Sequence, residues 1–133
     1  MIALITGSSR GIGRGIALSL AEAGATIYLT GRNTKGLDET AEEVSRRGGR
    51  AISVRCDHTD DHQVEALFAG MKALDLLVNN VWGGYENHPN GLGMDPFWKL
   101  PTQYWDEMFQ RGLRAHFVTS RLAVPLMLPL KRG

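Results

Sequence analysis

The stretch Thr6-Gly-Ser-Ser-Arg-Gly-Ile-Gly13 lies between a short apolar run and a helical pattern. Its three glycines have separate uses at such a turn. Gly7 lets the chain turn sharply out of a strand, Gly11 lets the backbone approach a phosphate, and Gly13 lets the helix pack closely. The start of the helix then offers unpaired N–H groups and the positive end of a helix dipole. The stretch therefore predicts a loop that binds the phosphates of a nucleotide.

Two other interpretations of this loop are a plain turn and a P-loop. An ordinary strand-to-helix turn can also be rich in glycine, and a glycine pattern is weak evidence without its context. Here a predicted strand and a predicted helix flank the loop as a phosphate site requires. A P-loop is excluded, because no Gly-Lys-Ser/Thr follows to supply a lysine and a magnesium-binding hydroxyl. Glycines at 7, 11 and 13 also make a wider loop than the common dinucleotide fingerprint.

Outward from the loop, strands and helices alternate along the chain. Apolar runs without alternation are typical of strands buried on both faces of a parallel sheet. Ile12, Ile16, Leu20 and Ala23 have helical spacing and predict the first helix, which Gly24 ends. The fold class is α/β: the N-terminal half of a Rossmann-type doubly wound parallel sheet, with strand order 3-2-1-4 and one domain over residues 1–133. Strands are expected at 2–6, 26–30, 51–56 and 74–79, and helices at 12–23, 35–47 and 60–71.

The segment after the fourth strand has a different character. Residues 80–101 are rich in Gly, Pro and Asn and predict a long loop, which in a compact domain is more often functional than not. Thr102 is expected to cap a long helix that runs to about Val124. Pro125 and Pro129 predict an irregular end to that helix.

Composition and charge exclude several classes of protein. The net charge is +1 with acidic and basic residues interspersed, which argues against a nucleic-acid partner. No apolar stretch reaches the ~18 residues of a membrane helix, and the start is unlike a signal peptide. The lone Cys56, expected in the core, cannot form an internal disulfide, which fits a cytoplasmic location.

The four histidines, and the aromatic residues of the loop at 80–101, are the remaining candidates for a chemical role. No metal site is expected, because no cysteine or carboxylate pattern joins the histidines, which are expected in solvated or capping positions. The aromatic residues are expected either to line a substrate pocket or to collapse on the sheet edge. The residues concerned are His58, His62, His88 and His116, and Trp82, Tyr85, Phe97 and Trp98.

The chain resembles the short-chain dehydrogenase/reductase family. The G-x-x-x-G-x-G loop with Thr6 in front matches that family, as do Asn79-Asn80-Val81-Trp82-Gly83 after the fourth strand and Tyr104-Trp105-Asp106 at the next helix. Asp57 matches the position that contacts the adenine in the family. The resemblance covers essentially all of the chain but only the first half of a family member. Within the family, the Trp-Gly-Gly-Tyr loop and residues 112–117 look most like the dehydrogenase/reductase member 1 group.

The end of the second strand favours NADP(H) over NAD(H). Folds that bind NAD usually place an Asp or Glu there for the ribose 2′-hydroxyl, whereas this strand ends Thr30-Gly31-Arg32. An arginine can bind a 2′-phosphate in bidentate fashion, and Arg10 adds a second cation within reach. The alternative is that both arginines are ordinary surface residues. The candidate cofactor-binding residues are Gly7, Ser9, Arg10, Gly11, Ile12, Gly13, Arg32, Asp57, Asn79 and Val81.

The resemblance also shows departures from the family's catalytic pattern. The family uses a Tyr-x-x-x-Lys pair and a serine, and no such pair exists in this sequence. The family's helix asparagine is replaced by Gly112. Residues 71–75 form a short connection to the fourth strand, which implies either a trimmed loop or a distorted third helix. No catalytic residue is therefore assigned, and the chain alone is expected to be inactive.

Three functions remain from the sequence. The first is the NADP(H)-binding portion of an oxidoreductase that acts on carbonyl or alcohol substrates. The second is a non-catalytic nucleotide-binding or interaction protein that uses the open edge of the fourth strand and the exposed helix at 102–124, through which homo-oligomers could form. The third, an S-adenosylmethionine methyltransferase, would normally have an acid where Arg32 stands.

Overall fold

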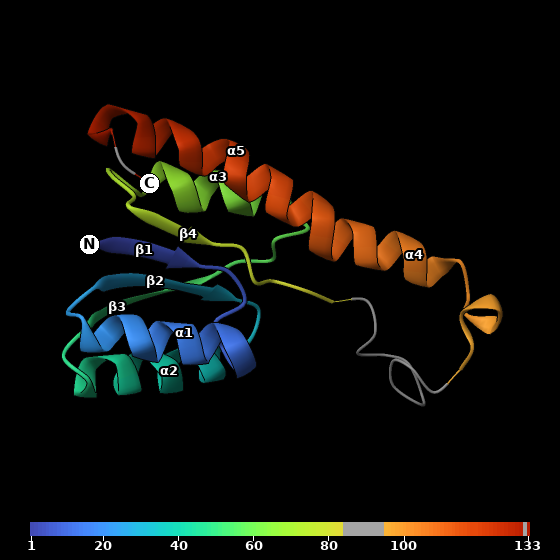
Figure 1. The fold of residues 1–133 in the computed structure, drawn as a ribbon, viewed down its shortest axis with the longest axis horizontal. Coiled ribbons are helices and arrows are strands. Elements are labelled where there is room, and N and C mark those ends of the chain that lie inside the picture. The colour runs from blue at the N-terminus through green and yellow to red at the C-terminus, as the bar shows by residue number, and fades with distance from the viewer. Residues whose placement is uncertain (84–94, 132) are drawn as a thin grey trace.

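The fold is known from a computed structural model, in which residues 1–83, 95–131 and 133 are described. Four parallel strands form one sheet in the order β3-β2-β1-β4, so the predicted fold class and strand order are confirmed (Figure 1). The strands are β1 (Ile2–Ile5), β2 (Thr26–Gly31), β3 (Arg50–Arg55) and β4 (Leu76–Val78). The α-helices are α1 (Gly11–Glu22), α2 (Thr34–Arg46), α3 (Asp61–Ala69), α4 (Gln103–Met108) and α5 (Ala115–Met127).

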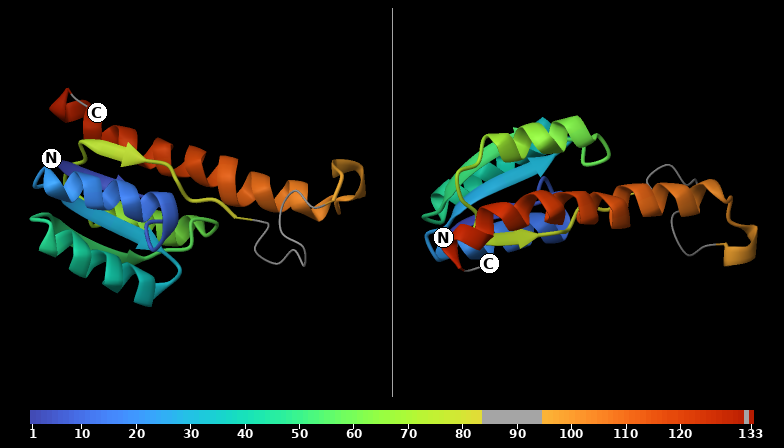
Figure 2. Two further views of the ribbon diagram at one scale, coloured as in Figure 1. Left: turned by 60° about the horizontal axis from the view of Figure 1, so that its bottom comes forward. Right: turned by 90° about the horizontal axis from the view of Figure 1, so that it is seen from above.

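Helices cover both faces of the sheet, with α1 and α2 on one side and α3 and α5 on the other (Figures 1 and 2). The central strand β1 supplies both cores, because successive side chains of a strand point to opposite faces. Leu4 packs with α3 and α5, while Ile5 packs with α1 and α2. Both are fully buried. This two-sided burial explains why the first strand is a continuous apolar run.

The smallest residues of α1 form its buried face. Ile12 is 77% exposed and Ala23 is exposed, whereas Gly13, Ala17 and Ala21 are buried. The smallest side chains face the sheet because they allow the helix to approach it closely. The large apolar residues Ile16 and Leu20 lie beside this contact and are only partly buried.

The third helix is shorter than predicted. It begins after Asp60, whose carboxylate accepts hydrogen bonds from the backbone N–H groups of His62 and Gln63, and it ends at Ala69. The connection that follows is held to the start of β1 by a 2.7 Å hydrogen bond from the Ile2 N–H to the Asp75 carboxylate. The helix is regular and short rather than distorted, and the connection after it is short. The strand β4 begins two residues later than expected.

The predicted long helix at 102–124 is interrupted. The π-helical segment η2 (Phe109–Arg114) joins α4 to α5, and the Thr102 side chain makes no capping hydrogen bond. Pro125 lies inside α5, which continues to Met127. A proline lacks the N–H that would bond to the carbonyl four residues earlier, but Pro125 is exposed, so water can satisfy that carbonyl.

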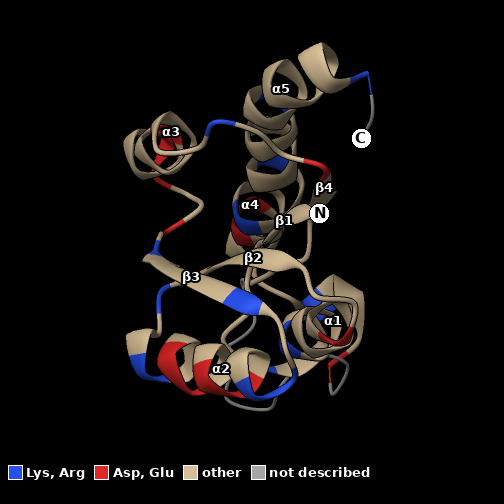
Figure 3. Cartoon of the chain, turned by 90° about the vertical axis from the view of Figure 1, so that its left-hand side faces the viewer, with Lys and Arg blue, Asp and Glu red and all other residues tan. Residues whose placement is uncertain are grey.

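Charged and apolar surface are divided between the helices. Acidic and basic side chains lie along the outer side of α2, whereas α5 carries few of them (Figure 3). Large apolar side chains on the helix after the loop are exposed, with Trp105 at 62% and Phe117 at 67%. In the described part of the chain, no helix combines the length and the apolar character needed to cross a bilayer.

Candidate functional site

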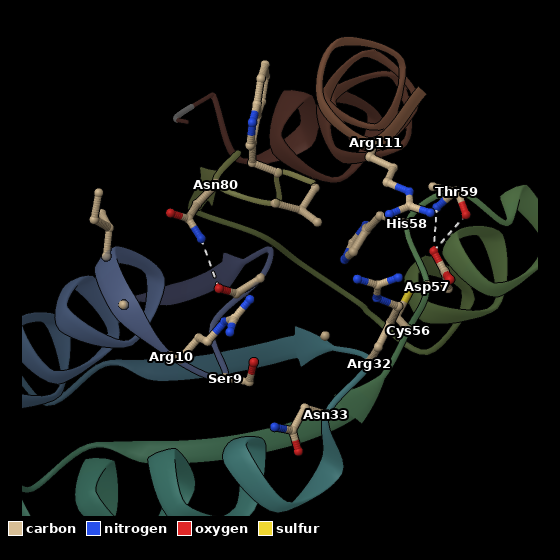
Figure 4. Close-up of a pocket in the computed structure, with 16 residues that line it drawn as sticks. Ser9, Arg10, Arg32, Asn33, Cys56, Asp57, His58, Thr59, Asn80 and Arg111 are labelled. Atoms are coloured by element: carbon tan, nitrogen blue, oxygen red, sulfur yellow. Dashed lines mark hydrogen bonds between the residues drawn. The ribbon is translucent and has the colours of Figure 1, made fainter. Parts of the chain in front are cut away.

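A pocket of about 610 Å³ lies at the carboxyl ends of the strands, which we call the strand-end pocket (Figure 4). In open α/β sheets ligands bind at this edge, where the strand order reverses on either side of β1. The pocket is lined by Gly7, Ser9, Arg10, Gly11, Ile12, Gly31, Arg32, Asn33, Cys56, Asp57, His58, Thr59, Asn80, Val81, Trp82 and Arg111.

The glycine loop is shaped to admit a ligand at its tip and to pack at its base. Gly7 and Gly11 have φ values of +68° and +57°, in the left-handed region that favours glycine. A Cβ on Gly11 would meet nothing within 4 Å, so its backbone is open to the pocket. A Cβ on Gly13 would lie 2.5 Å from the Gly7 carbonyl oxygen, so Gly13 is needed where α1 packs on the loop. Because α1 has no acidic residue in its first turn, its N-terminus keeps its positive potential.

Hydrogen bonds join the loop to the ends of the neighbouring strands. The Thr6 hydroxyl oxygen accepts from the backbone N–H groups of Asn80 and Val81, each at 2.9 Å. The Asn80 side-chain amide donates to the carbonyls of Thr6 and Gly7 at 2.8 and 2.9 Å. On the other side, the Thr30 N–H donates to the Ser8 hydroxyl at 2.9 Å. The loop is therefore held in place by the residues that follow β4 and by the end of β2.

The pocket lining includes every predicted cofactor-binding residue except Gly13 and Asn79. Gly13 lies beneath the loop, where it packs against Gly7. Asn79 is exposed, and its side-chain amide donates to the Ser120 hydroxyl of α5 at 2.9 Å. Asn80, the next residue, lines the pocket instead and bonds to the loop backbone. The cofactor role of all ten residues stays a prediction.

Cations dominate the strand-end pocket. Among its described lining residues Arg10, Arg32 and Arg111 are basic and only Asp57 is acidic. Burial alone would raise the pKa of Asp57, but hydrogen bonds from Thr59 and the nearby guanidinium groups of Arg32 and Arg111 bring it below its ordinary value. The carboxylate is therefore charged at neutral pH. The pocket as a whole is suited to an anionic ligand.

His58 is buried rather than solvated or capping, which corrects the prediction for this residue. Only 2% of it is exposed, and its Nε2 lies 2.8 Å from the Thr30 hydroxyl oxygen. That hydroxyl donates to the Ile5 carbonyl at 3.3 Å, so it accepts from a protonated Nε2. Burial lowers the pKa of His58 to about 4, with Asp57 opposing and His116 adding to the shift. The imidazole is therefore neutral at pH 7.

This burial predicts a loss of stability in mild acid. The unfolded histidine binds a proton near pH 6.5 and the folded one only near about 4, so the free energy of unfolding falls as the pH falls through that window and levels off below it. Between pH 7 and pH 5 the contribution of His58 is expected to fall by about 2 kcal/mol. Urea unfolding at both pH values measures it. His58→Gln should lack this component and His62→Gln, at an exposed site, should keep it; equal pH dependence in the wild type and His58→Gln would contradict the argument.

Cys56 and His116 are held by packing and hydrogen bonds within the fold. Cys56 is buried as expected, and burial, aided by Asp57 and Asp60, raises the pKa of its thiol to about 11. His116 lies with its Nε2 2.7 Å from the Val81 carbonyl oxygen. His88 and Tyr85 lie outside the described residues. Within the described residues, no three His, Cys, Asp or Glu side chains gather as a metal site would need.

The loop aromatics take different positions. Trp82 is 48% exposed and lines the pocket, while its indole packs over Gly112 of η2. A Cβ on Gly112 would clash with the Trp82 ring, which gives a reason for a glycine inside this helix. Phe97 and Trp98 are 79% and 72% exposed and contact each other edge to face, so they do not collapse on the sheet edge.

Several pocket residues were not predicted from the sequence. Asn33, His58 and Thr59 follow the ends of β2 and β3, so the rule that ligands bind at strand ends would have found them if it had been extended beyond the first residue of each turn. Arg111 had no such signal, because it lies on a helix segment far along the chain.

The glycine loop, the α1 N-terminus and the strand-end pocket define a Rossmann-type nucleotide-binding fold. The family model for short chain dehydrogenase matches residues 1–133, and the chain belongs to this family of oxidoreductases.

Similar proteins agree with this assignment. The chain is 41% identical to the dehydrogenase/reductase SDR family member 1 of Mus musculus, over 99% of this chain and 44% of that protein. The structure of a metagenomic short-chain oxidoreductase in complex with NADP matches with a TM-score of 0.86 and 31% identity, over 100% of this chain and 59% of the other. L-sorbose reductase from Gluconobacter frateurii, complexed with NADPH and L-sorbose, matches with a TM-score of 0.78 and 29% identity, over 93% and 46%. The chain thus spans about half the length of these relatives.

Proposed function

We propose that this chain is the NADP(H)-binding portion of a short-chain dehydrogenase/reductase that acts on carbonyl or alcohol substrates. The observation that carries the proposal is the strand-end pocket, which joins an open glycine loop at a helix N-terminus to a cluster of arginines. Two similar structures hold NADP or NADPH, which supports the same cofactor here. The lone buried Cys56 agrees with a cytoplasmic location.

The residues of the pocket divide the binding task among them. The N–H groups at the start of α1 and the open backbone at Gly11 would hold the pyrophosphate. Arg32, at the end of β2, lies where the ribose 2′ position is read, and Arg10 lies in the neighbouring loop. Two guanidinium groups favour a 2′-phosphate over a hydroxyl. The bound nicotinamide would supply or accept a hydride.

We expect no turnover by the chain alone. The 133 residues contain no Tyr-x-x-x-Lys pair, so no side chain here is assigned to proton transfer at a substrate. The position of the family's helix asparagine is taken by Gly112 and covered by the Trp82 indole. Binding and orientation of the nucleotide are the tasks left to this chain.

Calorimetric titration of the purified chain with NADPH and with NADH tests the proposal. NADPH is expected to bind at least about tenfold more tightly than NADH, because a charge-assisted hydrogen bond contributes about 1.5–3 kcal/mol. Equal affinity would reject the preference for NADP(H). No binding of either nucleotide by a folded chain would reject the nucleotide site.

A second candidate function is that of an interaction protein. Phe109, Leu113 and Phe117 line an apolar groove on the helix after the loop and are 41%, 60% and 67% exposed. An apolar surface of this kind commonly marks a contact with another protein. Self-association through it is the simplest form, and sedimentation of the wild type against Phe117→Ser tests it. A wild type that stays monomeric at high concentration would reject self-association.

A further inference from the structure

Arg111 enters the strand-end pocket from the wall opposite the sheet. It lies on η2, whereas the other two arginines of the pocket lie on turns that follow β1 and β2. Figure 4 shows the guanidinium groups of Arg111 and Arg32 directed into the pocket from these two walls, with Asp57 and His58 beside them. Arg32 and Arg111 are separated by 79 positions in the sequence, so no local motif relates them.

The local helix geometry holds Arg111 in this position. η2 is a π-helical segment, and such an insertion changes the direction in which the side chains of that turn point. The next residue, Gly112, is buried and packs under the Trp82 indole, which ties the segment to the residues after β4. The His116 ring contacts the Val81 carbonyl one turn later. Arg111 therefore projects from a backbone that is anchored to the pocket rim.

The order of the strands shows which part of a nucleotide Arg111 would meet. The phosphate-binding loop follows β1, and the residue that reads the ribose follows β2. The sheet continues in the same direction to β3, so a base attached to that ribose lies over the residues after β3, which are Asp57, His58 and Thr59. Arg111 faces this end of the pocket, since its charge and that of Arg32 both act on the Asp57 carboxylate.

We propose that Arg111 stacks its guanidinium on the nucleotide base and forms, with Arg32 on the opposite wall, a slot that holds the base at the end of β3. This rests on the proposed nucleotide site. A guanidinium is planar and weakly hydrated, so it stacks on aromatic rings, whereas a lysine ammonium offers only a point charge. A neutral planar base between the two cations also separates like charges that face each other. Asp57 lies at the edge of the slot, where a carboxylate accepts hydrogen bonds from a base amino group.

The test compares two ligands that differ only in the 2′-phosphate. Adenosine 5′-monophosphate and adenosine 2′,5′-bisphosphate are titrated by NMR into the wild type, Arg111→Gln and Arg111→Lys. Both variants are expected to weaken both ligands by a similar factor of about tenfold, because the base is common to the two and lysine does not replace a planar stack. The control is Arg121→Gln, which removes the same charge from an exposed position on α5 and should change neither affinity.

Four other outcomes are possible, and each would contradict either stacking by Arg111 or the nucleotide site itself. Wild-type affinity in Arg111→Lys would overturn stacking, and so would a loss confined to the bisphosphate, which would make Arg111 a phosphate ligand. Unchanged affinity in Arg111→Gln, in a wild type that binds both ligands, would reject this inference and leave the nucleotide site standing. A folded wild type that binds neither ligand would reject both together. Circular dichroism of each variant confirms that the comparison is made between folded chains.

Discussion

Replacing Arg32 with aspartate is expected to weaken NADPH binding about hundredfold and to weaken NADH binding much less, because NADH loses only the Arg32 wall of the base slot. The substitution removes a charge-assisted hydrogen bond to the 2′-phosphate, which contributes about 1.5–3 kcal/mol, and places a like charge beside that phosphate. NADH presents a hydroxyl at the same place, which a carboxylate can bind. Calorimetric titration of the variant and the wild type with both nucleotides gives the two ratios.

The matched control is Arg50→Asp. Arg50 begins β3 at the amino end of the sheet, so the variant carries the same change in net charge on the edge away from the strand-end pocket. It is expected to bind NADPH as the wild type does. An equal loss in both variants would mean that the overall charge, rather than a specific contact at Arg32, determines the affinity.

Replacing Gly13 with alanine is expected to destabilise the chain by about 2 kcal/mol or more and to reduce nucleotide binding. The new methyl group would lie 2.5 Å from the Gly7 carbonyl oxygen and would also meet the Asn80 side-chain amide. These two groups are hydrogen-bonded to each other at 2.9 Å, so neither moves without breaking that bond. Overpacking of this kind typically costs about 1–3 kcal/mol. Urea unfolding measures the free energy, and titration with NADPH measures the binding.

A second glycine of the same helix provides the comparison. A Cβ on Gly15 would meet nothing within 4 Å, so Gly15→Ala removes only the flexibility of glycine. It is expected to stabilise the chain by up to about 1 kcal/mol, because alanine is the better helix former. If Gly13→Ala were as stable as Gly15→Ala, the close packing of α1 on the glycine loop would be wrong.

The parts of the fold that depend on local pattern were predictable. The continuous apolar run of β1, the glycine turn and the following helix indicate a parallel sheet, and right-handed connections between such units lead to the observed strand order. Arg32 is found in the pocket because it directly follows a strand, and strand ends meet at one edge of the sheet.

The parts that depend on packing between distant segments were not predictable. The apolar residues of α1 did not show which side faces the sheet, because the contact is made by Gly13, Ala17 and Ala21 rather than by the largest side chains. The π-helical turn depends on Trp82 packing over Gly112, a contact between segments 30 positions apart. His58 follows a strand, which is a position typical of an exposed polar residue. Its hydrogen bond with the Thr30 hydroxyl allows it to be buried instead.

The most direct test of the nucleotide site is to map it on the protein by NMR. NADPH is added to the 15N-labelled chain and the backbone amide signals are followed. The largest changes are expected at residues 7–13, 31–33 and 57–59, which form the glycine loop and the turns after β2 and β3. Changes confined to the apolar groove at 109–117, or no changes at the strand ends, would contradict a nucleotide site in the strand-end pocket.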